Sequence, residues 1–335
     1  MAKPQAVTGI VAPSVYWTYT GETADIIWGT SQGARTYRLD ASFDGKPYKV
    51  IYEGKATSYS ADLSKEDFAK AVFRVYGVND DGVSDFTEST EMLAIDWAVR
   101  EDGDSLYLEP FELIINSNAS NFDDVPSVRE TTETITGLDG EIPVDMKYAP
   151  RIFELVTFMK DAFEDNGERE EFIRKCAAHI NRSVRKLRHF LYNNRLFSVK
   201  RTESQFYRFP ARCNFDISLK AYDVFGYAPN ENIIYGDGLC QNKGDEVCKP
   251  VFILKGELNN PVITVNDVEY QIAIDTEEND TVYIDSGKES VIIERDGVQS
   301  YAAGAFYKDY PVFNVGNNTV SGCYAVKWRD KYFTV

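Results

Sequence analysis

Apolar and polar residues alternate over short stretches in the first part of the chain, which is typical of half-buried β-strands. Turn signals at Asp44-Gly45 and Asp81-Gly82 separate these stretches. The pattern predicts strands over residues 24–28, 36–43, 48–52 and 72–79. Short strands at this spacing indicate a small antiparallel sandwich within residues 1–94.

The same alternation returns from Val251 onward, with hairpin turns expected at Asn266-Asp267, at residues 278–280 and at Asp296-Gly297. It predicts a second sandwich of roughly 85 residues. Residues 229 to 250 are rich in Pro, Asn, Gly and Asp, so we interpret them as a linker or long loop.

The middle of the chain, residues 95–228, combines strands with one helix. Asp165 and Glu168 form a capping-box pattern at the start of the helix. Apolar residues then recur in steps of four and three, at Ile173, Ala177, Ile180, Val184, Leu187 and Leu191. This stripe predicts a helix over about residues 165–192 that lies across a sheet; a coiled coil is the alternative, although the repeat is short for one.

Residues 151–159 precede the helix and are apolar at both alternating sets of positions. We therefore expect a strand that is buried on both faces. A chain of 335 residues exceeds the usual size of one hydrophobic core. The expected fold class is mainly β, as multi-domain β-sandwiches with one prominent α-helix, and the expected domains are 1–94, 95–228 and 229–335.

Charge is distributed unevenly along the chain. The net charge is −17, yet residues 169 to 212 hold twelve Lys or Arg against three Glu, so the rest of the chain carries −26. One interpretation is a solvated helix face; the other is a basic belt that meets an acidic surface of a neighbouring subunit. The candidate interface residues are Arg174, Arg182, Arg185 and Arg188. The acidic balance argues against specific nucleic-acid binding.

Candidate metal ligands are sparse. The five cysteines form no CxxC pair and are interpreted as free thiols rather than a zinc site, with pairing of Cys240 and Cys248 left open. His179 and His189 fall on the predicted helix without a third ligand. The acidic stretch 275–280 lacks the glycine and the distant Glu of a calcium loop, which favours a polar hairpin. No cofactor or metal is expected.

No GxSxG, HExxH or P-loop pattern is present, so an enzyme is not expected. A pair of carboxylates would still suffice for a glycosidase. Aromatics and cations interleave at residues 205–210 and 328–333, as on single-strand nucleic-acid platforms. A half-buried strand gives the same alternation and is preferred. The sequence has neither a signal-peptide pattern nor an apolar run of about 18 residues, so no export signal or membrane anchor is expected.

Residues 1–94 resemble a fibronectin type III module. The resemblance rests on a first-strand segment, a tryptophan strand and a pair of late strands, namely Pro4-Gln5-Ala6-Val7-Thr8-Gly9-Ile10, Ile26-Ile27-Trp28 and residues 73–84. The tyrosine of that family's corner is Phe73 here, so the corner's hydroxyl anchor is absent.

The remaining two thirds resemble the distal tail protein family of long-tailed bacteriophages. The motifs are collinear: Gly137-Leu138-Asp139-Gly140, Tyr148-Ala149-Pro150-Arg151-Ile152, residues 216–227, Asn260-Pro261-Val262-Ile263, Val282-Tyr283-Ile284-Asp285-Ser286 and residues 309–318. The resemblance implies a homo-hexameric ring, formed through residues 95–228, with a galectin-like C-terminal sandwich. It implies a non-enzymatic virion protein, made in the host bacterial cytoplasm. Expected partners are the tail tube protein and tail-tip hub or receptor-binding proteins. A carbohydrate-binding adhesin and a cell-wall hydrolase are the alternatives.

Overall fold

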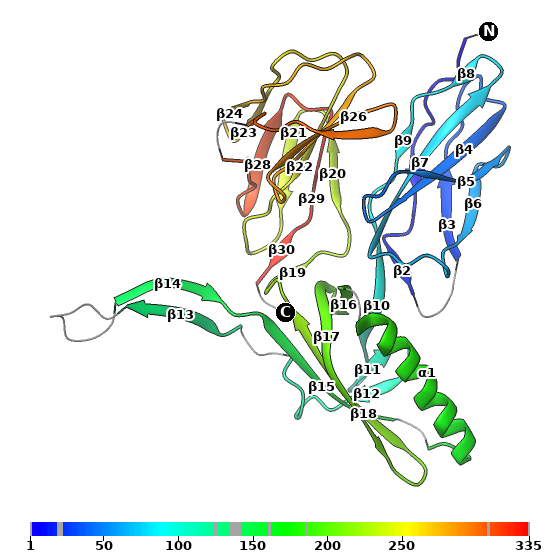
Figure 1. The fold of residues 1–335 in the computed structure, drawn as a ribbon, viewed down its shortest axis with the longest axis vertical. Coiled ribbons are helices and arrows are strands. Elements are labelled where there is room, and N and C mark those ends of the chain that lie inside the picture. The colour runs from blue at the N-terminus through cyan, green and yellow to red at the C-terminus, as the bar shows by residue number, and fades with distance from the viewer. Residues whose placement is uncertain are drawn as a thin grey trace. The chain divides into compact units, whose positions relative to one another are not determined.

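The computed structural model describes residues 2–18, 23–122, 126–133, 142–159, 162–184, 187–306 and 309–333. Over these residues the fold is mainly β with one helix, which confirms the predicted fold class (Figure 1). The chain divides into two compact units. Unit 1 combines Met1–Ala94 with Tyr227–Tyr332, and unit 2 combines Ile95–Gly226 with Phe333–Val335.

The first part of unit 1 is a sandwich of two antiparallel sheets. One sheet has the order β1 (Ile10–Val11), β3 (Thr23–Trp28), β6 (Ser58–Asp62). In the other, β7 (Lys70–Asn79) pairs with β4 (Thr36–Phe43), β8 (Gly82–Val83) and β9 (Thr87–Glu88), and β4 pairs with β5 (Lys49–Gly54). A short strand, β2 (Val15–Trp17), precedes β3. Trp28 is buried between the sheets against Tyr37 and Tyr52, as a tryptophan in a sandwich core should be.

The second part of unit 1 is another sandwich. Its larger sheet has the order β20 (Asn232–Tyr235), β29 (Ala325–Trp328), β22 (Val251–Lys255), β25 (Thr281–Asp285), β26 (Ser290–Arg295), β27 (Val298–Tyr301). Its smaller sheet has the order β21 (Gly238–Asn242), β28 (Gly316–Ser321), β23 (Val262–Val265), β24 (Val268–Gln271). In sequence, β19 (Gly226–Tyr227) crosses the boundary between the units and β30 (Lys331–Tyr332) ends unit 1.

Three of the expected hairpin turns have the backbone that their residues favour. Asp44-Gly45, Asn266-Asp267 and Asp296-Gly297 have positive φ at both positions. Asn, Asp and Gly tolerate this left-handed conformation, which matches the twist of the flanking strands. Asn266-Asp267 and Asp296-Gly297 join β23 to β24 and β26 to β27 directly and so fix those registers, whereas Asp44-Gly45 begins a longer loop of residues 44–48 between β4 and β5.

The interpretation of residues 229 to 250 as a linker is wrong. β20 pairs with β29 and β21 pairs with β28, so this segment supplies one strand to each sheet of the second sandwich. The turn-forming residues around these strands dominate the local composition. The pairing partners lie 74 to 96 residues later in the chain, from Asn242 with Gly316 to Asn232 with Trp328, where a local pattern cannot reveal them.

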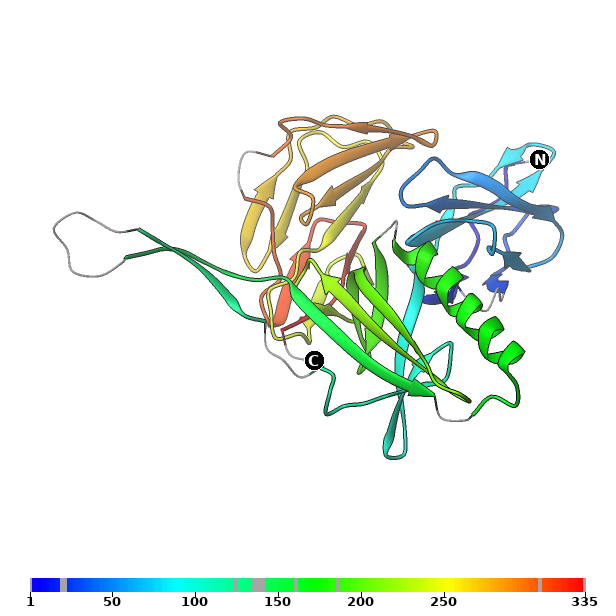
Figure 2. The same cartoon turned by 60° about the horizontal axis from the view of Figure 1, so that its bottom comes forward.

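Unit 2 is built on strands that close into a circuit. The circuit runs from β10 (Met92–Asp102) through β11 (Ser105–Glu109), β12 (Leu113–Ile115), β15 (Arg151–Met159), β18 (Cys213–Ala221) and β17 (Arg195–Arg208) to β16 (Arg188–Tyr192), which pairs in parallel with β10. Closure satisfies the backbone groups that an open edge would leave unpaired. A two-stranded hairpin, β13 (Val128–Glu133) with β14 (Ile142–Tyr148), extends away from the circuit in both Figure 1 and Figure 2.

The strand expected over residues 151–159 is present as β15, but its expected burial on both faces is wrong. Arg151, Phe153 and Leu155 are buried, whereas Ile152 is 46% exposed and Phe158 is 39% exposed. One face of the strand therefore packs on the core, and the other carries apolar side chains into solvent.

The only helix among the described residues is α1 (Asn166–Val184), which lies alongside the strands of unit 2 (Figures 1 and 2). The Asp165 carboxylate accepts a hydrogen bond from the Glu168 amide at 2.9 Å, as the capping-box pattern predicts. Ile173, Cys176 and Ile180 turn inward and are buried. The helix thus contributes to the core that the strand circuit encloses.

The predicted end of the helix, near residue 192, is wrong. Residues 188–192 form β16, in which Arg188 and Phe190 are buried with the period of two that belongs to a strand. Leu187 is exposed and Leu191 lies in the strand, so both continue the helical spacing by coincidence. The following Asn193-Asn194, with positive φ at both residues, forms the turn to β17. That dipeptide is a hairpin signal within the sequence.

Candidate functional site

A densely bonded charged group of unit 1 is the Arg74 guanidinium in β7, whose side chain is 2% exposed. Its Nε donates to Glu88 Oε2 at 2.8 Å, and its terminal nitrogens donate to both oxygens of Glu294 in β26. A further bond of 2.7 Å joins Nη2 to the Tyr283 hydroxyl. The rings of Tyr48 and Phe86 lie 3.9 and 4.0 Å from its central carbon. The planar guanidinium is thereby bonded at its edge and packed against aromatic rings.

A second cation, Lys327 in β29, extends this cluster. Its ammonium lies 3.2 Å from Glu88 Oε1 and 4.0 Å from Glu231 Oε2. Glu88 therefore contacts one cation through each carboxylate oxygen. We call Arg74, Glu88, Glu231, Glu294 and Lys327 the buried charge cluster; all five belong to unit 1.

The pKa values of the two acids beside Lys327 are shifted in opposite directions. Burial tends to raise the pKa of Glu88, but Lys327 and Arg74 outweigh it, so the pKa is lowered and the group is held ionised. Burial also raises the pKa of Glu231, and there Lys327 does not outweigh it because the neighbouring Glu91 adds repulsion. The pKa of Tyr283 is raised by burial.

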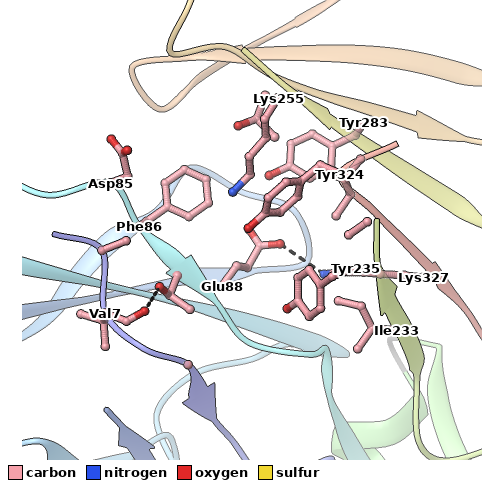
Figure 3. Close-up of a pocket in the computed structure, with 16 residues that line it drawn as sticks. Val7, Asp85, Phe86, Glu88, Ile233, Tyr235, Lys255, Tyr283, Tyr324 and Lys327 are labelled. Atoms are coloured by element: carbon pink, nitrogen blue, oxygen red, sulfur yellow. Dashed lines mark hydrogen bonds and ion pairs between the residues drawn. The ribbon is translucent and has the colours of Figure 1, made fainter. Parts of the chain in front are cut away.

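Next to the buried charge cluster lies a cavity of about 520 Å³, drawn in Figure 3. Such a volume is within the roughly 300–1,000 Å³ of small-molecule sites. Rings line it, supplied by Phe86 from the first sandwich and by Tyr235, Tyr283 and Tyr324 from the second. Its charged lining groups are Asp85, Glu88, Lys255 and Lys327.

Paired acids with separated pKa values are one mark of a glycosidase. Here Glu88 and Glu231 both contact the Lys327 ammonium, so a sugar oxygen or a water would have to displace that cation to reach both acids. The cluster thus fits a buried structural network better than an acid–base pair. Among the described residues no group of three or more His, Cys, Asp or Glu is placed to hold a metal ion.

The predicted interface residues do not share one environment. Arg174 and Arg182 are exposed on α1. Arg185 lies outside the described residues. Arg188 is 4% exposed, with Nε 3.2 Å from Asp96 Oδ2, so its expected outward orientation is wrong. The buried carboxylate of Asp96 holds this cation inside unit 2.

His179 and His189, both placed on the helix by the sequence, lie on different elements. His179 is buried in α1, with Nε2 3.0 Å from the Asp96 carbonyl and its ring against Trp97 and Phe111. Burial lowers the pKa of His179, which favours the neutral ring. His189 is in β16.

All five cysteines are free and buried. Burial raises the pKa of Cys240 to about 11 and those of Cys248 and Cys323 to about 12. Thiols with such values are almost entirely protonated near pH 7 and react slowly.

The acidic stretch 275–280 is bonded to a cation of the protein itself. Arg295 donates to both oxygens of Asp280, at 2.8 and 2.7 Å, and to Glu277 at 2.6 Å. The hydrogen bonds from Arg295 lower the pKa of Asp280. The acids of this turn thus bind a guanidinium.

The two aromatic and basic segments lie mainly in strands. In β17, Phe206 stacks on Phe215 at 4.4 Å, while the next residue, Tyr207, is 39% exposed. In β29, Trp328 is buried and Lys327 belongs to the buried charge cluster. The first segment thus alternates between a packed and an open side over Phe206 and Tyr207, as the strand interpretation predicts, whereas in the second Lys327 and Trp328 are both largely buried.

Sequence reasoning missed the buried charge cluster and the cavity. Arg74 and Glu294 are 220 residues apart, and Glu88 and Lys327 are 239 apart. None of the four belongs to a local pattern that points to its partner, so no spacing in the sequence marks the cluster. Phe73 and Val75 pack in the core of the first sandwich, so Arg74 between them lies on the other face of β7, where an arginine gives no signal of a buried site.

The chain matches no protein-family model and no curated protein. It is similar to the solved Dit protein of phage SPP1, described as a hub of the adsorption apparatus in phages infecting Gram-positive bacteria, with 10% identity and a TM-score of 0.46 over 65% of this chain and 93% of that chain. It is also similar to a chain of the phage p2 baseplate, with 9% identity and a TM-score of 0.34 over 89% of this chain and 98% of that chain. A fibronectin type III-like protein from Clostridium thermocellum is 25% identical, with a TM-score of 0.22 over 28% of this chain and 93% of that chain. All three TM-scores are low, so these likenesses define no family for this chain.

No helix within the described ranges has the length and apolar character needed to cross a membrane.

Proposed function

We propose that this chain is a structural, non-enzymatic subunit of a phage or phage-like tail tip. In this proposal residues 95–228 form a homo-hexameric ring that joins the tail tube protein to the hub, baseplate or receptor-binding proteins. Residues 1–94 and 229–335 are the flanking fibronectin type III-like and galectin-like sandwiches, and the protein is located in the virion. The collinear sequence motifs of the middle and C-terminal thirds support this assignment.

The observation that carries the proposal is the open face of β15, β18 and β17 in unit 2. Phe158 pairs with Asn214 and Asn214 with Tyr207, so these three side chains form one row across the strands. Further along the same face, Ile152 pairs with Lys220. Phe158, Tyr207 and Ile152 are all exposed. A sheet face with a polar background and a few large apolar side chains suits a contact with other subunits.

Charge supports a second copy of the chain as the partner. Arg174 and Arg182 project from α1, and the chain outside residues 169–212 is strongly acidic. In a ring, each subunit presents two different faces to its neighbours, so a basic face and an acidic face can meet at every contact. Assembly of this kind requires complementary surfaces and no reactive group.

Mass photometry and negative-stain imaging of the purified chain test the proposal. The expected result is a closed ring with six times the subunit mass. The substitutions Phe158→Ser and Tyr207→Ser on the open face should reduce the ring fraction, whereas Tyr301→Ser, on exposed β27 in unit 1, should not. A strictly monomeric mass at high protein concentration, with no ring in the intact particle, contradicts the proposal.

A further inference from the structure

We propose that the cavity of unit 1 binds a saccharide, with a sugar ring against Tyr235 and Tyr324 and its hydroxyl groups on the charged lining residues. This inference concerns a second property of the chain. It requires no ring and holds or fails independently of the assembly proposed above.

The first argument is the position of the two tyrosine rings. Tyr235 is 60% exposed and Tyr324 is 47% exposed, although both line a cavity. Their rings meet edge to face, with centroids 5.9 Å apart. Each therefore keeps ring surface that no protein group covers. The C–H face of a sugar ring is a flat apolar surface that can cover such a ring.

The second argument is a cation without an acidic partner. Lys255 extends into the cavity in Figure 3, with Nζ 4.1 Å from the ring centroid of Tyr324 and 5.1 Å from that of Phe86. Within the described residues it makes no ion pair, so its three N–H donors remain available. Because the rings attract the ammonium, its position over the cavity is favoured before any ligand arrives.

The third argument is the Glu88 carboxylate, a hydrogen-bond acceptor held in a fixed position. Glu88 points into the cavity, and its two oxygens are held by Arg74 and Lys327. The Tyr48 hydroxyl also donates to Glu88 Oε2, at 3.2 Å. A carboxylate offers about four acceptor positions, so about one remains for a hydroxyl donor of the ligand. The lowered pKa of Glu88 keeps those acceptors available near neutral pH.

The balance of charge selects the class of ligand. Asp85 and Glu88 offset Lys255 and Lys327, so the lining carries no net charge. A site for phosphate or nucleotide would be expected to concentrate cations. The lining combines hydrogen-bond donors, acceptors and exposed aromatic rings. This combination suits a neutral ligand that is apolar on one face and has hydroxyl groups along its edge. A neutral sugar has this construction.

The test uses the full chain and isothermal titration with methyl glycosides of the common neutral hexoses, 6-deoxyhexoses and N-acetylhexosamines. Concentrations should reach about 20 mM, because a Kd of 1 mM corresponds to about −4 kcal/mol and single sugars bind weakly. The expected result is saturable binding of at least one glycoside. Binding should weaken at least tenfold in Tyr235→Ala and in Lys255→Met.

The matched control is Tyr301→Ala, which removes another highly exposed tyrosine of the same sandwich, on β27 and outside the cavity lining. Its affinity should equal that of the unaltered chain. Thermal midpoints equal to that of the unaltered chain would show that the variants are folded. If Tyr235→Ala is unfolded, the affinity of Lys255→Met alone tests the proposal. Saturable binding to none of the glycosides, or binding that both cavity variants leave unchanged, overturns the proposal.

Discussion

The cations of α1 and the cations of the buried charge cluster occupy opposite environments. Arg174 and Arg182 lie in the most basic stretch of the sequence and are exposed to solvent. Arg74 and Lys327 lie outside that stretch, are largely buried, and contact carboxylates from two sandwiches. Exposed pairs contribute only about 0.2–1 kcal/mol, whereas loss of one partner from a buried pair costs about 3–5 kcal/mol. Burial, rather than local charge density, thus decides which cations hold this fold together.

The largest effect is expected from Arg74→Met. The substitution keeps most of the side-chain volume but leaves Glu88 and Glu294 without their shared cation. The free energy of unfolding should fall by about 3–5 kcal/mol, because Glu294 stays buried without its cation and Glu88 keeps only Lys327. Chemical denaturation monitored by circular dichroism measures this change.

The control is Arg35→Gln, which removes a cation that pairs with Asp80 while both side chains are more than half exposed. It should change the free energy of unfolding by less than about 1 kcal/mol. Equal losses in the two variants would contradict the distinction between buried and exposed cations.

The next largest effect is expected from Arg188→Met in unit 2. Arg188 and Asp96 are 4% and 2% exposed, so the variant leaves a buried acid beside an apolar side chain. We expect a loss of about 3 kcal/mol, against less than about 0.5 kcal/mol for Arg182→Met on the exposed part of α1.

Thiol alkylation locates the effect of Arg188→Met. Cys176 is buried in unit 2 and Cys240 is buried in unit 1. A buried thiol reacts only when its surroundings open, so the variant should accelerate alkylation of Cys176 more than that of Cys240. Equal acceleration at both sites would indicate that the pair stabilises the whole chain rather than unit 2.

The sequence allowed the strands with clear turn chemistry to be predicted. Asp44-Gly45, Asn266-Asp267 and Asp296-Gly297 are local signals; the turns are where they were expected, and the strands predicted over residues 36–43 and 48–52 are present as β4 and β5. The start of α1 followed from Asp165 for the same reason. The sequence did not predict β20 and β21, because these strands are stabilised by partners far along the chain.

The same limit explains the errors at charged residues. Arg188 was expected to face outward from the helix as a candidate interface residue, because the apolar stripe continued through Leu187 and Leu191. It instead lies inside, paired with Asp96, which is more than 90 residues earlier in the chain. The cavity unites residues 6–9 and 85–88 with strands that follow residue 230. Only the folded chain brings these together, so composition and spacing could name the class of fold but not this site.

A smaller effect, which depends on pH, is expected at Glu231. Its pKa is raised in the folded state by burial, so ionisation of this acid lowers stability at pH values above that pKa. Glu231→Gln should therefore raise the free energy of unfolding near pH 7, by up to about 1 kcal/mol. The gain should fade as the pH drops through the pKa of Glu231, because the unaltered acid then becomes neutral as well.

Glu88→Gln should have the opposite effect and lower the free energy of unfolding near pH 7. The pKa of Glu88 is lowered, so its contribution is present above its ordinary pKa and is lost as the pH falls through the folded-state value. Glu269→Gln, at an exposed position of β24, is the matched control and should have no effect of either sign. Denaturation curves from pH 3 to 8 would refute the assignment if Glu231→Gln destabilised the chain near neutral pH.

The smallest effect on stability is expected from the double substitution Arg174→Glu and Arg182→Glu, which reverses two exposed charges of α1. The thermal midpoint should stay nearly unchanged, since each exposed position contributes within about 0.5 kcal/mol. Ring formation should nevertheless fall, because the reversed face would meet the acidic remainder of a neighbouring subunit. Added salt should weaken assembly of the unaltered chain too, because the Debye length shortens from about 10 Å at 0.1 M to about 3 Å at 1 M. Mass photometry at both salt concentrations, with the thermal midpoint measured on the same samples, separates the two effects. Rings that form equally well in the double variant would identify these arginines as a solvated face.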